Sequence, residues 1–453
     1  MGNLLTNGWI GGLVGPIRSQ RRLEETESEI VSLEPVANTP ALGIYLSAAA
    51  QLGLFRLRGD FVPQLIKERG LPLALAIDEI LGSVPFAQKI TSANPPAHAT
   101  RNELESLGKA VAMNAISERE MALLSDAVIP LQASNDEWPR VATYANLFSL
   151  ASELEREPGE FEFMETATRN AGFADPRLAN WSDAWLAYEI RDMLAVAHER
   201  LCYELLDELN QQGGGKQNPL APASVIRTLL SRADGLLEAL VRLGLADYEE
   251  KVEEISIKGL VKRVVKATKK KRALRNGLYR WDGPLTETAV IEAALSLSSG
   301  QAMIAMVAWI LVAQRVSADS EGHNAQLALL AGDEDRRVGV FDVVINSVRN
   351  WTDDDSSVID LCAELMSFTI QQHLNIAWSR MQTDLKKDVA LLTVDEGKWK
   401  PRGKQIAAGR TVSRIDQTIG WMRQLRWIDE HGITATGKAY ADRAYGIVSR
   451  ASE

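Results

Sequence analysis

Residues 181–210, WSDAWLAYEIRDMLAVAHERLCYELLDELN, carry the clearest structural signal in the chain. Apolar side chains recur there at intervals of three and four residues, as at Leu194, Ala197, Leu201, Leu205 and Leu209. That period is typical of an amphipathic α-helix with one face on a core. Working outward, the same reasoning predicts helical structure at 41–55, 101–154, 224–244, 288–316 and 342–381. Strand-like patterns are scarce before residue 388, so the expected fold class is mainly α.

A chain of 453 residues is too long for one ordinary hydrophobic core, so several domains are expected. The stretch 211–219, QQGGGKQNP, has the composition of a flexible linker, and the acidic, glycine-containing stretch 317–337 interrupts the helical pattern again. We therefore predict an N-terminal helical region at 1–210, a middle helical domain at 220–316 and a C-terminal domain at 338–453.

The last sixty residues follow an order of their own. A strand is predicted at 389–394, a basic glycine-containing loop at 398–410, a helix at 411–425, a hairpin turning at His431-Gly432 and a final helix at 437–449. The run Ile433-Thr434-Ala435-Thr436-Gly437 resembles the step from the wing into the last helix of winged-helix domains. Thr434 or Thr436 would cap that helix, and Gly437 would allow a tight entry.

The winged-helix resemblance implies that helix 411–425 approaches a DNA groove. Eight Lys or Arg and a single acid, Asp416, lie between 398 and 426, which favours nucleic acid over a purely structural or protein-docking role. The candidate contacts are Arg410, Arg414 and Arg423. Because we expect Arg410 and Arg414 to be exposed near the first turn, replacing them by Ala should leave the melting temperature nearly unchanged.

A second basic segment lies in the middle domain. Ten Lys or Arg and no acid occur between 258 and 280, and without these charges the remaining chain carries a net charge of −20. Lys258, Lys262, Lys266 and Lys270 form one row at i+4 beside an apolar stripe that includes Ile257 and Leu260. The candidate phosphate-binding residues are Lys258, Lys262, Arg263, Lys266, Lys269, Lys270, Lys271, Arg272 and Arg275. A membrane surface, a nuclear-import signal and an acidic protein surface are the alternatives.

Signals for catalysis, metals and cofactors are weak. The five histidines lack partners at metal-ligand spacing, and neither a P-loop nor a dinucleotide fingerprint occurs, so no catalytic residue, metal or cofactor is predicted. Cys202 and Cys362 fit buried thiols in a reducing compartment. Glu396-Gly397-Lys398 after a strand is the one hint of a metal-dependent nuclease, and a tight turn explains it better. With no bilayer-spanning run of apolar residues, a cytoplasmic location is expected.

These observations favour a non-catalytic subunit of a multi-protein complex whose partners are nucleic acid, DNA first, and other proteins. Its layout is similar to that of helical accessory proteins of bacterial anti-phage defence loci that end in a winged helix. A winged-helix transcriptional regulator and a divergent metal-dependent nuclease are the two alternatives.

Overall fold

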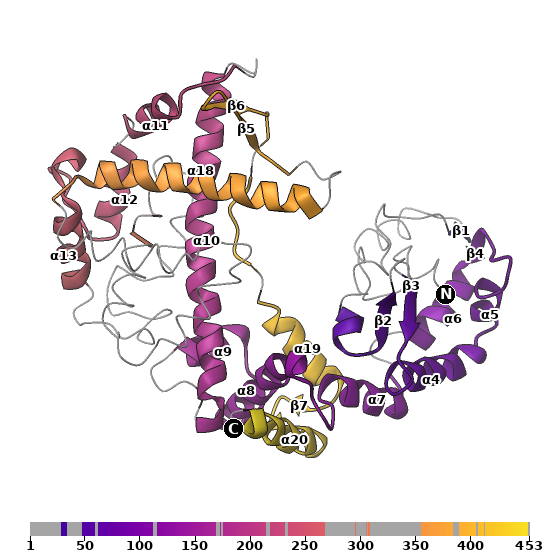
Figure 1. Cartoon of the computed structure of the whole chain (residues 1–453). Helices are drawn as coiled ribbons and strands as arrows, with labels where there is room; N and C mark the ends of the chain where they lie inside the picture. Colours follow the sequence, from indigo (N-terminus) through magenta and orange to yellow (C-terminus); the bar gives the residue numbers. More distant parts are fainter. Residues whose placement is uncertain are drawn as a thin grey trace. The chain divides into compact units, whose positions relative to one another are not determined.

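The computed structural model describes residues 29–33, 48–58, 62–111, 116–168, 173, 175–213, 218–231, 234–267, 295, 305, 307–308, 355–383, 389–404, 406–411 and 413–451. Helices make up most of these residues, which confirms the mainly α class (Figure 1). The chain divides into two compact units: unit 1 contains residues 1–159 and 415–453, and unit 2 contains residues 160–414. The division into 1–210, 220–316 and 338–453 stays a prediction, because much of 268–354 lies outside the described residues.

Unit 1 combines the N-terminal third of the chain with its last residues. Its N-terminal elements are β1 (Ile30–Ser32), β2 (Phe55–Arg58), β3 (Val62–Leu65), α4 (Gly70–Gly82), α5 (Pro85–Ile90), β4 (His98–Thr100), α6 (Arg101–Val111), α7 (Glu118–Val128), η2 (Asn135–Glu137) and α8 (Trp138–Leu154). Its C-terminal elements are α19 (Ile415–Gln424), β7 (Ile428–Asp429), β8 (Gly432–Ile433) and α20 (Ala435–Ala451). The strands pair antiparallel as β1 with β4, β2 with β3 and β7 with β8.

The two parts of unit 1 share a core centred on Trp427. This indole is fully buried and lies 5.5 Å from the ring of Tyr144 and 5.7 Å from that of Phe148, both on α8. It also stacks on Tyr440 of α20 at 5.0 Å, and its Nε1–H donates to Ser125 Oγ on α7 at 3.2 Å. The C-terminal segment therefore completes the core that the N-terminal helices begin.

The entry into α20 is built as the sequence predicts. The Thr434 hydroxyl accepts a hydrogen bond from the N–H of Gly437 at 3.0 Å and so caps the helix. A Cβ at position 437 would lie 1.9 Å from the carbonyl oxygen of Trp427, so only glycine fits there. The predicted hairpin is also present, but its turn lies at Glu430-His431, one residue earlier than predicted, and Gly432 is the first residue of β8.

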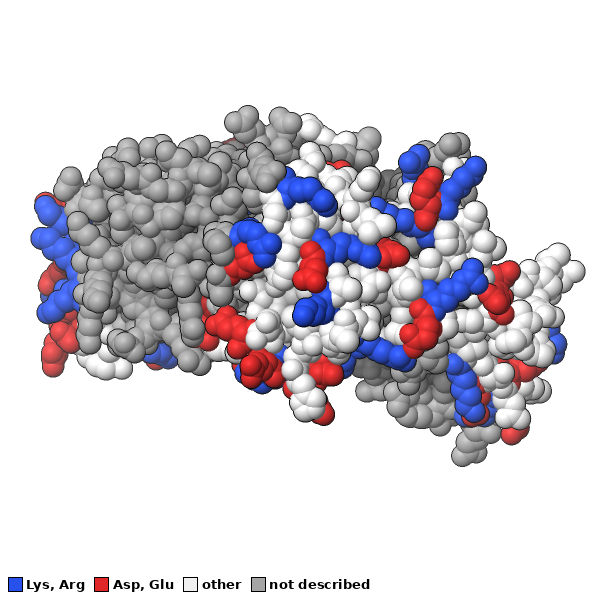
Figure 2. All heavy atoms as spheres, turned by 90° about the horizontal axis from the view of Figure 1, so that it is seen from below, with Lys and Arg blue, Asp and Glu red and all other residues white. Residues whose placement is uncertain are grey.

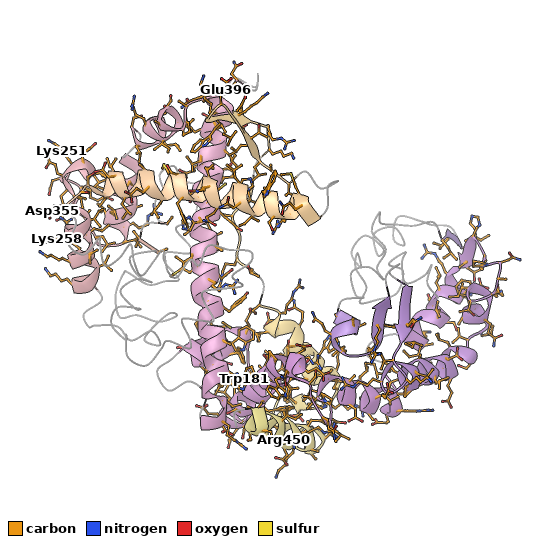
Figure 3. All side chains as sticks on the ribbon, viewed as in Figure 1. Trp181, Lys251, Lys258, Asp355, Glu396 and Arg450 are labelled. Carbon is orange, nitrogen blue, oxygen red and sulfur yellow. The ribbon has the colours of Figure 1, made fainter. Side chains whose placement is uncertain are left out.

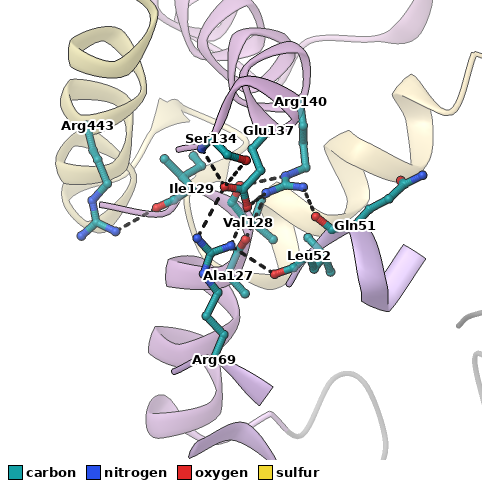
Figure 4. Close-up of polar contacts among 10 residues, drawn as sticks. All are labelled: Gln51, Leu52, Arg69, Ala127, Val128, Ile129, Ser134, Glu137, Arg140 and Arg443. Carbon is teal, nitrogen blue, oxygen red and sulfur yellow. Dashed lines mark hydrogen bonds and ion pairs between the residues drawn. The ribbon is translucent and has the colours of Figure 1, made fainter. Parts of the chain in front are cut away.

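A polar cluster around Glu137 joins four segments of unit 1 (Figure 4). The Glu137 carboxylate accepts hydrogen bonds from Arg69 at 2.5 Å and from Arg140 at 3.0 Å. Its second oxygen accepts from the backbone N–H and the hydroxyl of Ser134, at 3.0 and 3.2 Å, in a capping box at the start of η2. With a side chain only 11% exposed, Glu137 depends on these donors to stay ionised away from water.

Arginine side chains of unit 1 also donate hydrogen bonds to backbone carbonyl groups of neighbouring segments. Arg140 donates to the carbonyls of Gln51 at 2.6 Å and Val128 at 3.1 Å, and Arg443 of α20 donates to that of Ile129 at 2.9 Å. The last carbonyl groups of a helix lack partners within the helix. At the C-terminal end of α7, side chains from α8 and α20 supply the missing hydrogen bonds.

Unit 2 is built around the 34-residue helix α10. Its elements are α9 (Glu160–Thr168), η3 (Pro176–Leu178), α10 (Ala179–Gln212), α11 (Pro222–Leu230), α12 (Asp234–Arg242), η4 (Val252–Glu254), α13 (Ile257–Ala267), α18 (Val358–Thr383), β5 (Leu392–Asp395) and β6 (Lys398–Pro401). α18 crosses α10, and β5 pairs antiparallel with β6 (Figure 1). Leu194, Leu201, Leu205 and Leu209 of α10 are all buried in one hydrophobic cluster, as their spacing predicts.

Two predicted helices differ from the structure. Residues 41–55 were expected as one helix, but the described part ends in strand β2, whose partner β3 supplies the missing hydrogen bonds. Strands are scarce among the described residues before 388, as predicted, since β1 to β4 contain only three or four residues each. The helix expected at 224–244 is two helices, α11, which ends at Leu230 with Ser231 as its C-cap, and α12, which begins at Asp234. Within the described residues, no helix is long and apolar enough to cross a membrane.

Replacing Trp427 by Ala should destabilise unit 1 strongly. The change removes a fully buried indole from three aromatic neighbours, and such truncations cost about 3–5 kcal/mol. Trp421→Ala is the matched control because Trp421 is only half-buried on α19, so its loss should be no more than about half as large. Urea unfolding followed by circular dichroism measures both. Equal losses would mean that Trp427 does not organise this core.

Glu137 should make the stability of unit 1 depend on pH. Desolvation raises its pKa, but hydrogen bonds from Arg69, Ser134 and Arg140 outweigh that effect and lower the pKa to about 2. Because this value lies below the ordinary 4.5, the stabilisation is complete above pH 4.5 and is lost as pH falls towards 2, at about 1.4 kcal/mol per pH unit.

We therefore expect Glu137→Gln to be less stable than the wild type near neutral pH and to lose less stability between about pH 5 and pH 3. Glu118→Gln, which changes a carboxylate that is 81% exposed, should keep the wild-type dependence on pH. Urea midpoints across this range test the comparison. The role of Glu137 would be refuted if both variants followed the same pH profile.

Candidate nucleic-acid interface

Helix α13 carries the only part of the basic middle segment that the structure describes, and it is amphipathic as predicted. Ile257, Leu260 and Val264 are buried in the hydrophobic cluster of unit 2. The hydroxyl of Ser256 accepts the N–H of Gly259 at 3.0 Å and fixes the start of the helix. The apolar stripe therefore holds α13 in place with its lysines on the outer side.

Lys258, Lys262 and Lys266 follow one another at i+4 along α13, a rise of about 6 Å per step. Lys262 and Lys266 are exposed, and among the described residues neither ammonium group has an ion-pair partner. The Nζ of Lys258 lies 3.8 Å from Asp355 Oδ1, and both side chains reach the same edge of unit 2 (Figure 3). Within the described part of the chain, this face therefore carries two cations without an ion-pair partner and one loosely paired cation.

Arg263 of α13 is engaged within the protein. Its guanidinium donates to both carboxylate oxygens of Glu250, at 2.5 and 2.6 Å, and to the carbonyl of Leu245 at 3.1 Å. The hydrogen bond to Arg263 lowers the pKa of Glu250 to about 2. This bidentate pair anchors α13 to the loop after α12, so Arg263 is a structural residue rather than a free phosphate ligand.

The remaining predicted phosphate ligands of the middle segment are not placed by the structure. Lys269, Lys270, Lys271, Arg272 and Arg275 lie outside the described residues. They stay a prediction from the sequence, as continuations of the α13 row.

Arg410 lies in an extended segment, residues 406–411, that binds α10. Its Nη2 donates to Glu189 at 2.9 and 3.1 Å, and its Nε donates to Asp192 at 3.1 Å. Both carboxylate side chains are buried, with 4% and 2% of their surface exposed. Arg410 therefore neutralises two acids of its own chain.

The backbone of this segment also bonds to side chains of α10. The N–H of Thr411 donates to Asp192 Oδ1 at 2.8 Å, and its carbonyl accepts the hydroxyl of Tyr188 at 2.6 Å. The N–H of Gly409 donates to Glu199 Oε2 at 3.2 Å. Burial raises the pKa of Glu199, and burial beside Asp192 and Glu189 raises that of Tyr188 to about 12.

These contacts correct the predicted helix 411–425, which begins at Ile415 instead. The N–H and carbonyl groups of Thr411 are used by α10, and Arg414 adopts a left-handed backbone conformation with φ of 66°, so neither residue continues a helix. Arg410 is not near a first helical turn, and it is not a freely exposed side chain. The expectation that its loss leaves stability unchanged no longer follows.

Arg423, the third arginine expected to contact nucleic acid, lies on α19 in unit 1. Its Nε donates to Glu157 Oε2 at 3.0 Å, and its Nη2 bonds to the other oxygen of the same carboxylate. The carboxylate of Glu157 raises the pKa of Arg423 through these hydrogen bonds. The pattern is general on the face shown in Figure 2, where arginines and lysines alternate with acids over the described surface.

The side chains that could take part in catalysis are buried, half-buried or part of a turn. His198 is half-buried, its Nδ1 lies 2.6 Å from Thr369 Oγ1, and desolvation lowers its pKa to about 4. Burial raises the pKa of both Cys202 and Cys362 to about 12, which makes them poor nucleophiles. Glu396 and Gly397 form the turn between β5 and β6, both with positive φ. No cluster of three metal-ligating side chains occurs in the part of the chain that is described.

No protein-family profile, curated protein or solved structure matches the chain.

Replacing Arg410 by Ala should destabilise unit 2, because Glu189 and Asp192 would stay buried without their cation. Removing one partner of a buried ion pair costs about 3–5 kcal/mol, and the 39% exposure of Arg410 reduces our expectation to about 1–3 kcal/mol. Arg242→Ala, which breaks an exposed pair with Glu238, should cost less than about 1 kcal/mol. Chemical unfolding measures both changes.

A second variant distinguishes the loss of charge compensation from the loss of packing. In the triple variant Arg410→Ala, Glu189→Gln, Asp192→Asn, the uncompensated charges are gone, so most of the lost stability should return. An Arg410→Ala variant as stable as the wild type, or a triple variant less stable than Arg410→Ala, would contradict the role of this ion pair.

Proposed function

We propose that the protein is a non-catalytic subunit that contacts the phosphate backbone of nucleic acid through the lysine face of α13. One observation carries this proposal. Lys262 and Lys266 are exposed on one helix face and unpaired among the described residues, in a chain whose net charge is −10. An unneutralised row of lysines in an acidic protein is suited to a strongly anionic polymer.

The chemistry of lysine fits backbone contact. A lysine ammonium acts as a hydrated point charge with no fixed geometry, and it therefore binds phosphate without reading a base. The rigid attachment of α13 through Ile257, Leu260 and the Arg263–Glu250 pair would hold the row straight. The proposal extends the row to Lys269, Lys270, Lys271, Arg272 and Arg275, and Lys258 takes part if phosphate displaces Asp355.

The arginines near the C-terminus have a different place in the proposal. Arg410 and Arg423 are bound to carboxylates of the same chain, so we leave them out of the phosphate-binding set. The winged-helix resemblance is kept as a proposal for residues 415–451 alone, where α19, the hairpin β7–β8 and α20 follow in the expected order. Membership of a multi-protein complex, as in anti-phage accessory proteins, is part of the same proposal.

Binding to a fluorescent duplex and to a single strand of the same length tests the proposal. The logarithm of affinity should fall linearly with the logarithm of salt concentration, and each phosphate contact contributes about 0.9 to the slope for a duplex. We expect Lys262→Ala, Lys266→Ala to reduce the duplex slope by about 2 and Lys262→Glu, Lys266→Glu to abolish binding.

The matched control is Lys109→Glu, Lys438→Glu, which makes the same charge change at two exposed helical positions of unit 1. If net charge alone mattered, this control would weaken binding as much as the α13 variant. That result, or wild-type binding that does not depend on salt, would overturn the proposal.

A further inference from the structure

An apolar groove lies between α11 and α18 in unit 2. Its volume is about 610 Å³, which falls in the range of small-molecule sites. On the α11 side it is lined by Ala223, Ile226, Arg227 and Leu230, which recur at three and four residues along one helix face. Ile359, Ala363 and Ser367 line the α18 side at steps of four. One side-chain stripe from each helix thus lines a mostly hydrocarbon trough.

Arg227 is the charged residue of this lining, and it is exposed. Its guanidinium makes no ion pair or side-chain hydrogen bond with any described residue. Most other arginines that the structure describes behave differently: Arg69, Arg140, Arg263, Arg410 and Arg423 each bind a carboxylate of the chain. Within the described residues this guanidinium beside an apolar trough has no carboxylate partner, so in a chain with a net charge of −10 it offers a site for an anionic ligand.

We propose that this groove binds a free medium- to long-chain carboxylic acid, with the tail along the trough and the carboxylate on Arg227. The apolar stripes match a hydrocarbon chain, and the bidentate geometry of guanidinium matches a carboxylate. Ser367, also in the lining, carries a hydroxyl that can donate to the second carboxylate oxygen or its water. The site is separate from the lysine face of α13 and independent of the function proposed for it.

The groove is open along one side, and this sets the expected strength of binding. Full burial of one methylene corresponds to about a fourfold change in Kd. A hydrocarbon tail that keeps one side in contact with water should gain roughly twofold in affinity per methylene. Lengthening octanoate to dodecanoate should therefore lower Kd about 16-fold. The contact with Arg227 should account for about a further tenfold, the usual scale of a hydrogen-bonded charge near the surface.

Titration calorimetry with dodecanoate, at concentrations below those that form micelles, tests the proposal on the full chain. We expect saturable binding to one site that Arg227→Gln weakens about tenfold. Arg242→Gln, the same change on the neighbouring helix α12, should leave Kd unchanged. Dodecan-1-ol should bind more weakly than dodecanoate and should not respond to Arg227→Gln, because it lacks the carboxylate.

A second variant tests the trough itself. Ala363 is half-buried on α18, so Ala363→Phe would fill the groove without entering the core and should abolish dodecanoate binding. Circular dichroism confirms that the variant is folded, and Ala223→Phe, at an exposed position of the same lining, serves as an alternative if it is not. Absence of saturable binding, equal binding by Arg227→Gln, or equal affinity for dodecan-1-ol would overturn the proposal. Dodecanoate binding by Lys262→Glu, Lys266→Glu should match the wild type, so failure of one proposal does not decide the other.

Discussion

A carboxylate that is buried away from water needs hydrogen-bond donors, and this constraint organises both units of the protein. In unit 1 the carboxylate is Glu137, whose oxygens accept hydrogen bonds from Ser134 and Arg140 in its own stretch of chain and from the distant Arg69. In unit 2 the carboxylates are Glu189 and Asp192, which bind Arg410 more than 200 residues away along the chain. Each cluster joins pieces that the hydrophobic pattern alone would leave unconnected, and each would be costly to break from one side only. The buried acids therefore determine which segments lie together, while the apolar faces supply most of the driving force.

The same constraint explains how the two basic residue types divide their roles. Arginines such as Arg69, Arg263 and Arg410 are bound to carboxylates of the chain, where a planar fork with several donors suits two oxygens at once. The lysines of α13 stay exposed, and at Lys262 and Lys266 no described acid approaches. Counting positive residues along the sequence treats both types alike and so overstates the charge offered to a partner. The structure weakens the case for nucleic-acid contacts by the arginines near the C-terminus. The α13 face remains the stronger basic surface.

Local patterns in the sequence predicted the elements that periodicity controls. The helices α10 and α13 appeared where apolar residues recur at three and four. The Thr434 cap, the step into α20 and the hairpin, to within one residue of its turn, followed from local turn chemistry. The hairpin β2–β3 was missed because the apolar run before Phe55 reads as a continuing helix, and only pairing with Val62–Leu65 makes it a strand. The pairing of Arg410 with α10 could not be predicted, since no local pattern links residues so far apart. The Glu137 cluster did leave a signal: Ser134 and Glu137 have the spacing of a capping box, although nothing in that spacing indicates Arg69.

The order of the chain through the two units has a consequence for biosynthesis. Unit 2 is inserted between the two parts of unit 1, so residues 1–159 leave the ribosome long before residues 415–453. During that interval Tyr144 and Phe148 lack the indole of Trp427 that covers them, and Ile129 lacks the guanidinium of Arg443. Unit 2 has its own buried cluster and is able to form first. A nascent chain stalled before α19 would therefore present an unfinished aromatic surface, which residues 415–453 close.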